Sequence, residues 1–387
     1  MRAKISLTSG LIAVLLLPAS CFAQSPDSTI TPEMLLPHLT YLASPDREGR
    51  DDWGKIESRD YIINHFKSHE LKPLFGESYL QVVPQFGSED EKPPIVGQNI
   101  GAFVAGTDPE LKDEWIIVNA HYDHLGIRNG KVYPGADDNA SGVSMLLEVA
   151  AQVAKSPCRR SVAFLSFDLE EYLLWGSRWF LAHSPMDVEN IKFCLTADMI
   201  GRSLGGIDSP IVFVLGSERS LQVREEIKKV KVPEDLELAR LGVDIIGVRS
   251  DYGPFYYRRI PFLFFSTGEH PDYHTPQDTL ERLDITKAAR VSTVMSQVAF
   301  RMANTEEEII WNGEVSPDLE EVRAVNRVAT HFLKADAANQ FEMTDLQRFF
   351  LTQVKSKTNY MIRNNQVSDN ERKWLVRATQ IMMLTLF

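Results

Sequence analysis

Five groups of polar residues, each next to a short apolar run, constrain the fold and chemistry of this chain more than any other feature. They lie at residues 121–123 (HYD), 135–139 (GADDN), 170–171 (EE), 198–199 (DM) and 273–274 (YH). The apolar runs alternate with segments of helical periodicity, which predicts a largely parallel sheet with helices on both faces. Ligands of such sheets lie beyond the carboxyl ends of the strands. We therefore expect the five groups to converge on one rim.

The expected elements can be placed from these patterns. Buried strands are predicted at 115–120, 162–167, 193–197, 211–215 and 262–265, and helices at 141–155, 177–183, 219–229 and 284–301. Residues 31–73 look helical, whereas 75–97 look like a loop rich in proline, glycine and charge. Residues 304–387 show helical patterns without strand signals. The prediction is a three-layer α/β/α fold with a mostly parallel central sheet and a helical C-terminal appendage.

The chemistry of the groups points to metal. Together they supply two imidazoles and several carboxylates, a donor set that suits a pair of hard-to-borderline ions, most plausibly zinc. Adjacent Glu170 and Glu171 repel each other unless a cation lies beside them, and Asp198 is costly to bury without a partner. A metal-dependent hydrolase is therefore the leading hypothesis.

Each group also has a simpler interpretation. His121 at a strand end is often a structural hydrogen-bonding residue, and the two glutamates suit a solvated acidic turn. Residues 135–142 suit a helix-capping loop, because Asp and Asn are common caps. Capping and metal binding are compatible there, with one aspartate capping the helix and the other bridging two ions.

The N-terminus indicates export. Arg2 and Lys4 precede a short apolar run at 11–17, and small residues follow at 19–23, as in a secretory signal peptide. The run is too short to span a bilayer. A rival interpretation makes Cys21 a lipidated first residue, although Pro18 stands where such signals usually have leucine. The predicted division is a signal peptide at 1–23, a catalytic domain at 24–303 and a helical extension at 304–387, in a periplasmic or secreted protein.

Composition limits the partners. The net charge of −12 argues against nucleic acid or an anionic membrane as a partner. After removal of the signal only Cys158 and Cys194 remain, and they suit either a disulfide or two buried thiols.

Several motifs resemble those of the zinc exopeptidases that include bacterial leucyl aminopeptidases and aminopeptidase Y, with glutamate carboxypeptidase and glutaminyl cyclase as more distant relatives. The order and spacing match at residues 119–126 (NAHYDHLG), 134–142 (PGADDNASG), 167–171 (FDLEE), 197–202 (ADMIGR), 250–251 (SD) and 272–279 (DYHTPQDT), with further likeness at 41–50 (YLASPDREGR) and 98–101 (QNIG). The resemblance covers about residues 36–301 and leaves out the helical tail.

The resemblance implies a role for each residue. One zinc would be held by His121, Asp138 and Asp198, and the other by Asp138, Glu171 and His274, so that Asp138 bridges two ions. Glu170 would be the general base that activates water and then protonates the leaving amine. Asp123 would orient His121, and Tyr273 would either stabilise the oxyanion or serve as an aromatic packing residue.

Two departures from the family pattern stand out. Many bacterial relatives read Ser-Asp-His where this chain has Tyr252 after Asp251, and many carry a protease-associated domain for which 75–97 leaves no room. The expected activity is aminopeptidase action on peptides with a free N-terminus. The alternatives are glutaminyl cyclisation, which uses one working zinc, and a non-catalytic binding module. Side-chain specificity and oligomeric state are not predicted by the sequence.

Overall fold

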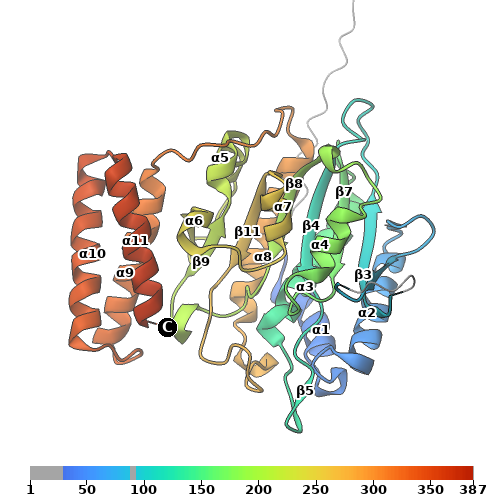
Figure 1. The fold of residues 1–387 in the computed structure, drawn as a ribbon, viewed down its shortest axis with the longest axis horizontal. Coiled ribbons are helices and arrows are strands. Elements are labelled where there is room, and N and C mark those ends of the chain that lie inside the picture. Colours follow the sequence, from blue (N-terminus) through green and yellow to red (C-terminus); the bar gives the residue numbers. More distant parts are fainter. Residues whose placement is uncertain (1–28, 88–92, 387) are drawn as a thin grey trace, which may run out of the picture.

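The central feature of the fold is a nine-stranded sheet in the part of the chain that the computed structural model describes, residues 29–87 and 93–386. Its path runs β1-β3-β7-β4-β8-β11-β9-β10, and β2 pairs with β3 beside this path (Figure 1). The strands are β1 (Lys72–Pro73), β2 (Leu80–Pro84), β3 (Ile95–Val104), β4 (Trp115–His121), β7 (Ser161–Phe167), β8 (Ile191–Ala197), β9 (Ile211–Leu215), β10 (Glu237–Leu241) and β11 (Phe262–Ser266), while β5 (Ile127–Arg128) and β6 (Lys131–Val132) form a separate hairpin.

The strand directions decide which loops meet. β4 is parallel to β7 and β8, and β8 is parallel to β11, so the carboxyl ends of these four strands share one edge of the sheet. β9 runs antiparallel to β11, and β3 runs antiparallel to β7. The expected parallel centre is confirmed, and antiparallel strands flank it.

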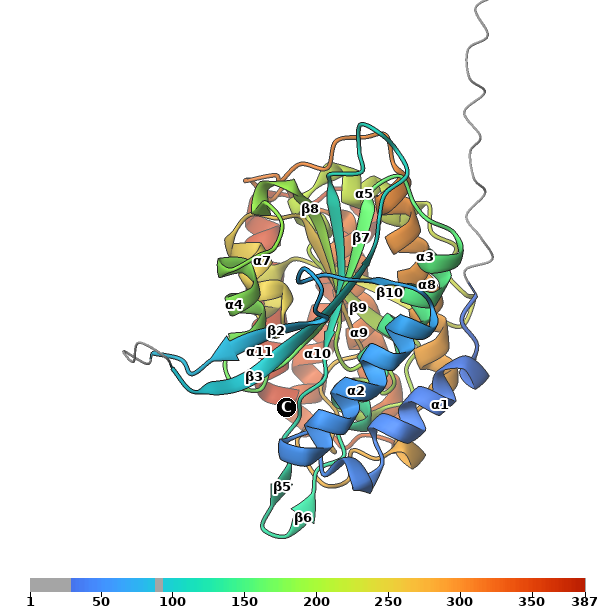
Figure 2. The same ribbon diagram turned by 90° about the vertical axis from the view of Figure 1, so that its right-hand side faces the viewer.

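Helices cover both faces of the sheet, as predicted. One apolar core joins the sheet to α1 (Pro32–Leu42), α2 (Asp52–Ser68), α3 (Gly142–Lys155), α5 (Leu221–Lys228) and α8 (Ile285–Asn304). The other core joins it to α4 (Trp175–Ala182), α6 (Val243–Ile246), α7 (Tyr252–Tyr257) and the C-terminal helices. Figure 2 shows α1, α2, α3 and α8 on one side of the strands and α4 and α7 on the other. The three-layer α/β/α prediction is therefore confirmed.

The loop predicted at 75–97 is partly wrong, because it contains β2 and the first residues of β3. These two strands form an antiparallel pair at the side of the sheet, with Val82 opposite Gln98. Their outer residues are exposed, so no continuous apolar run marks them, and Pro84 and Pro94 interrupt the pattern that remains.

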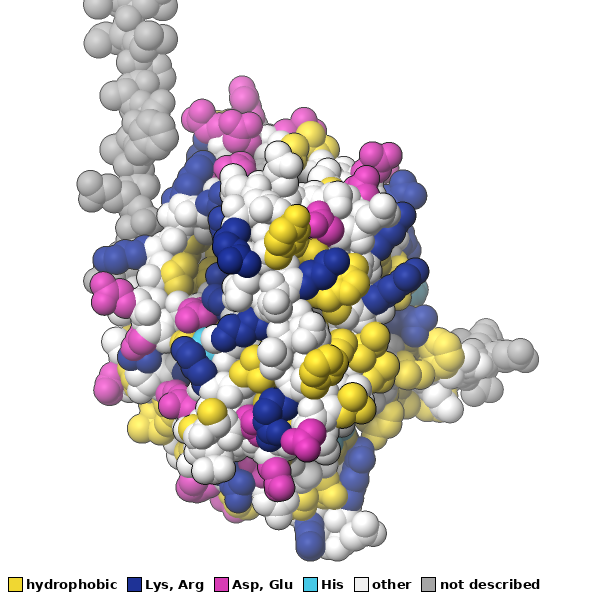
Figure 3. Space-filling model, turned by 90° about the vertical axis from the view of Figure 1, so that its left-hand side faces the viewer, with side chains coloured by type: hydrophobic (Ala, Val, Ile, Leu, Met, Phe, Trp, Pro, Cys, Tyr) yellow, Lys and Arg dark blue, Asp and Glu magenta, His cyan; other side chains and the backbone are white. Residues whose placement is uncertain are grey.

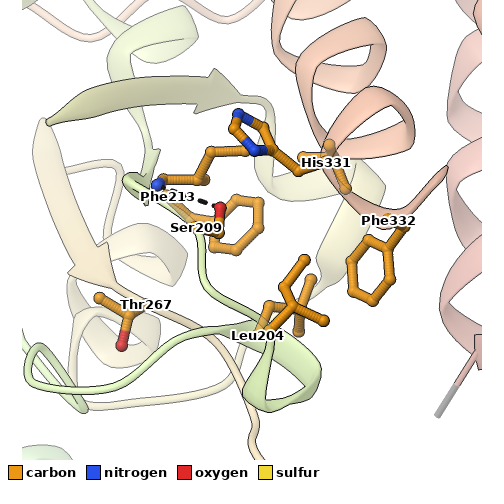
Figure 4. A pocket seen from close by; sticks show the side chains of 9 residues that line it. Leu204, Ser209, Phe213, Thr267, His331 and Phe332 are labelled. Carbon is orange, nitrogen blue, oxygen red and sulfur yellow. Dashed lines mark hydrogen bonds between the residues drawn. The ribbon is translucent and has the colours of Figure 1, made fainter. Parts of the chain in front are cut away.

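The C-terminal segment forms α9 (Leu319–Ala337), α10 (Asp345–Asn364) and α11 (Asp369–Leu386). Apolar residues of α9 such as Val328 belong to the same core as Phe213 of β9, and α9 packs along β10, the last strand of the sheet. The contact is close: the cavity in Figure 4, which His331 and Phe213 help to line, measures only about 10 Å³. Such a space holds no more than about one water molecule. The appendage therefore covers an edge of the sheet.

The outer side of this appendage carries apolar side chains among charged ones (Figure 3). The most exposed are Leu346 and Phe349 of α10 and Leu384 of α11.

Cys158 and Cys194 are both buried free thiols. Among residues 29–87 and 93–386, no helix is long and apolar enough to cross a membrane. The expected signal peptide at 1–23, with Cys21, lies outside the described residues.

Candidate metal centre

The structure brings the predicted ligands together at the shared edge of the sheet. His121 ends β4, Glu170 and Glu171 follow β7, and Asp198 follows β8. Asp138 lies in the turn at Ala136–Ser141 before α3, and His274 lies in the loop beyond β11. Residues that are up to 153 positions apart in the sequence thus form one cluster.

A first group of side chains surrounds the imidazole of His121. Its Nε2 lies 3.2 Å from Asp138 Oδ1 and 3.4 Å from Asp198 Oδ1. All three residues are at least 90% buried. Each offers one ligand atom to a common point.

A second group uses the other oxygen of the same aspartate. His274 Nε2 lies 3.1 Å from Asp138 Oδ2 and 3.1 Å from Glu171 Oε2. Burial lowers the pKa of His274, but its hydrogen bonds to these two carboxylates outweigh this effect and raise the pKa to about 10. Asp138 is therefore the residue that the two groups share.

The distances in both groups fit zinc. Ligand atoms about 2.0–2.1 Å from a tetrahedral zinc ion lie roughly 3.3 Å apart. The separations of 3.1–3.4 Å between imidazole nitrogen and carboxylate oxygen match this spacing. Imidazole and carboxylate are also ligands that zinc accepts. The residues present thus suit two ions that share Asp138.

Glu170 lies beside these groups and belongs to neither. Its Oε2 is 4.0 Å from His121 Nε2. Burial raises the pKa of Glu170 well above its usual value. The imidazole of His121 lowers this pKa, whereas the carboxylates of Asp198 and Asp251 raise it further. A carboxyl group placed near the reacting atoms with a raised pKa suits proton transfer near neutral pH.

Asp123 connects the first group to the acidic pair. Its carbonyl oxygen lies 3.2 Å from His121 Nδ1, closer than its carboxylate at 3.6 Å. The carboxylate instead accepts hydrogen bonds from the N–H groups of Glu170 and Glu171, at 3.2 and 3.3 Å. Asp123 therefore contacts both His121 and the backbone of the two glutamates.

The two tyrosines singled out by the sequence have different surroundings. The ring of Tyr273 stacks on His274 with centroids 3.9 Å apart, and burial and then the charge of Asp138 raise the pKa of its hydroxyl. Tyr252 points away from the cluster: its hydroxyl donates to Gly247 O at 2.7 Å, and its ring stacks on Phe264. Tyr252 thus holds the loop before α7, which is a packing role.

His124 is a residue of the cluster to which the sequence patterns assigned no role. Its Nδ1 lies 2.8 Å from Glu171 Oε1 and 3.8 Å from Asp138 Oδ2, and His124, Asp138 and Glu171 also form a group that could hold an ion. His274 is the better third ligand, because one nitrogen is equally close to both carboxylates. The direct hydrogen bond of His124 to Glu171 is typical of a residue that orients a ligand. The sequence signal for this role was the position of His124 directly after Asp123.

Arg50 supports the turn that carries Asp138. It is fully buried, and its five N–H groups donate to the carbonyl oxygens of Leu42, Tyr122, Pro134, Gly135 and Asp138 at 2.6–3.0 Å. Gly135 has φ +57°, and a Cβ there would lie 2.1 Å from Asp138 O and 2.6 Å from Arg50 Nη2. Only glycine therefore lets the turn pass the guanidinium this closely.

Asp278 supports the same turn from the opposite side. One carboxylate oxygen accepts the N–H of Asp138 at 3.0 Å, and both oxygens accept the N–H of Asp137 at 3.0–3.1 Å. Neither aspartate caps α3, contrary to expectation. The Asn139 side chain accepts the N–H of Gly142 instead.

Comparisons with known proteins identify the family of this chain. The model of peptidase family M28 matches residues 99–299, which include all five proposed ligands. The chain is 26% identical over 203 residues to aminopeptidase YwaD of Bacillus subtilis, an alignment that covers 50% of this chain and 42% of that protein. It thus spans less than half the length of this curated relative.

Solved structures show the same fold. An aminopeptidase from Aneurinibacillus sp. strain AM-1 superposes with a TM-score of 0.56 at 16% identity, over 75% of this chain and 98% of that one. A glutaminyl cyclase from Bacteroides thetaiotaomicron superposes with a TM-score of 0.55 at 18% identity, over 70% and 98%. The family match covers half of the chain and confirms the resemblance drawn from the motifs. This chain belongs to peptidase family M28.

Proposed function

We propose that the chain is a zinc-dependent aminopeptidase that uses two ions and removes N-terminal residues from peptides. The observation that carries this proposal is the sharing of Asp138: its two oxygens face two separate imidazoles, each with a second carboxylate. The proposed ligands are His121, Asp138 and Asp198 for one ion, and Asp138, Glu171 and His274 for the other. When bound, zinc in such a site acidifies water and polarises a carbonyl group.

The protein's own residues supply the other parts of the reaction. Glu170 accepts a proton from the attacking water and passes it to the departing amine, because its largely buried carboxyl group lies beside His121 and belongs to neither ligand group. Asp123 keeps His121 and both glutamates in place. Tyr273 stacks on the proposed ligand His274 and would donate a hydrogen bond to the oxyanion; burial and nearby carboxylates raise the pKa of its hydroxyl, which keeps it protonated.

The adjacent glutamates allow a paired test. Glu170→Gln is expected to bind two zinc ions per chain but to lose about 10²–10⁴-fold in kcat on leucine p-nitroanilide, which is the usual effect of removing a general base. Glu171→Gln is expected to lose zinc as well as activity, because it removes a ligand. Zinc content is measured by elemental analysis of the purified chains. Near-normal turnover by Glu170→Gln would refute the assignment of the base.

Glutaminyl cyclisation is the competing activity, and the superposition with a glutaminyl cyclase concerns the fold alone. Two complete ligand groups favour hydrolysis, because cyclisation needs one working zinc. A panel of aminoacyl p-nitroanilides, N-terminally blocked peptides and peptides with N-terminal glutamine separates the two. Cyclised product with full activity at one zinc per chain would favour the cyclase.

We also propose that the chain is exported after removal of residues 1–23, as the charged start and apolar run at 11–17 indicate. The division into a catalytic domain at 24–303 and a helical extension at 304–387 remains part of this proposal. N-terminal sequencing of the chain recovered from the periplasm or medium tests the cleavage site. Recovery of an uncleaved chain from the cytoplasm would contradict it.

A further inference from the structure

A cavity of about 590 Å³ opens beside the metal centre on the side of Glu171, which is one of its lining residues. Its walls come from the loop after β7, the β2–β3 hairpin, the first turn of α2 and α4. Figure 2 shows the hairpin extending past α4. The volume lies within the range of about 300–1,000 Å³ that is typical of small-molecule sites.

Apolar and aromatic side chains form one part of the cavity wall, and charged and polar side chains form the rest. Phe86 of the hairpin meets the ring of Trp175 edge to face, with centroids 4.7 Å apart. Trp175 is held in this orientation because its Nε1 donates to Pro84 O at 2.7 Å. Tyr172 and Leu173 at the rim are exposed by 55% and 79%. Such a surface favours an apolar or aromatic side chain.

The cavity contains two cations, and they differ in their partners. Lys55 lies 3.2 Å from Asp168 and 3.7 Å from Asp51, so its charge is compensated. Among residues 29–87 and 93–386, the guanidinium of Arg178 makes one long hydrogen bond, of 3.4 Å to Leu173 O, and no carboxylate lies within ion-pair distance of it. Its guanidinium is therefore available to an anion that enters the cavity.

We propose that this cavity binds the part of the peptide that follows the scissile bond, with an apolar second residue against the Phe86 and Trp175 rings and the C-terminal carboxylate of a short peptide on Arg178. The inference rests on the proposed peptidase function and adds a substrate class to it. The free cation decides the direction of binding, because it would repel the protonated α-amine of a peptide and attract a carboxylate. The substrates are thus dipeptides and tripeptides with a free C-terminus.

The test compares Leu-Phe, Leu-Phe amide and leucine p-nitroanilide with the zinc-loaded full chain. We expect kcat/KM for Leu-Phe to exceed that for its amide by about tenfold, the effect of one charge-assisted hydrogen bond pair. Arg178→Gln should bring this ratio close to one, mainly through KM. Arg363→Gln, in the last turn of α10 and outside the cavity, is the matched control and should keep the native ratio.

A second variant tests the apolar wall. Phe86→Ala should lower the preference for Leu-Phe over Leu-Gly about fivefold, because it removes one aromatic partner of the second residue. Equal kcat/KM for Leu-Phe and its amide in the native chain, or an unchanged ratio in Arg178→Gln, would overturn the inference and leave the peptidase function intact. A chain that cleaves none of the three substrates would instead overturn the proposed function, and this inference with it.

Discussion

Replacing Arg50 with lysine is expected to weaken both the fold and the metal centre. The guanidinium donates all five of its N–H groups to buried carbonyl oxygens, including that of Asp138. Lysine keeps the positive charge but has three donors on a single nitrogen. At least two of the five carbonyl groups would therefore lose their partner.

The expected loss can be estimated from those two groups. A hydrogen bond to a charged donor contributes about 1.5–3 kcal/mol, and water cannot replace it in a fully buried site. Arg50→Lys should therefore reduce the free energy of unfolding by about 3–6 kcal/mol. Because the turn that carries Asp138 loosens, zinc affinity should also fall, by about 10–100-fold.

The matched control is Arg160→Lys. Arg160 is equally buried, but it donates hydrogen bonds to Glu114 and to Thr305 O. It lies just before the first residue of β7, at the opposite end of the strand from the metal centre. Urea unfolding of the metal-free chains gives the stability change, and competition with a chelator gives the zinc Kd. Both variants should lose stability, and only Arg50→Lys should lose zinc affinity. Equal zinc affinity in the two variants would refute the positioning role of Arg50.

Two further predictions concern Asp278 and His65. Asp278→Asn replaces one carboxylate oxygen with an NH₂ group, so at least one N–H of this turn faces a donor; zinc affinity in chelator competition should fall about 10–100-fold, and an unchanged Kd would contradict this role. Burial and two neighbouring histidines lower the pKa of His65 to about 4, whereas the unfolded chain takes up this proton near pH 6.5. The folded state should therefore lose about 1–2 kcal/mol as the pH falls from 6.5 to 4, after allowance for partial exposure. Urea unfolding across this range should show a smaller loss in His65→Gln, and parallel curves for the two chains would contradict the prediction.

The proposed ligands could be located from the sequence because each lies next to an element that has its own local signal. His121 ends an apolar strand, and Glu171 and Asp198 follow two others. Because these strands are parallel, their carboxyl ends lie at one edge of the sheet, and no other sequence signal is needed to predict that the ligands meet there. Two antiparallel neighbours, β3 and β9, do not disturb this edge, since the ligand-bearing strands are the parallel ones.

The supporting residues could not be located in this way. Arg50 and Asp278 act on backbone groups that lie up to 88 and 141 positions away, and backbone groups carry no sequence signature. The pair β2 and β3 was missed for a different reason: exposed strands at the side of a sheet lack a continuous apolar run. For Tyr252, the family pattern drew attention to a position that in this chain serves packing.

The Arg50 network also determines how far the chain can be shortened. The segment that matches the family begins at residue 99, yet α1 and α2 precede it and carry buried residues such as Leu35 and Leu39. The N–H of Ile30, before α1, donates a hydrogen bond to Thr293 of α8, and Arg50, after α1, donates one to Tyr122 O. The segment that contains α1 is therefore attached to the rest of the fold on both sides. A fragment limited to 99–299 would expose the apolar side of α3 and leave the turn around Asp138 without its guanidinium. We therefore expect that a fragment which keeps this turn intact must include α1 and Arg50.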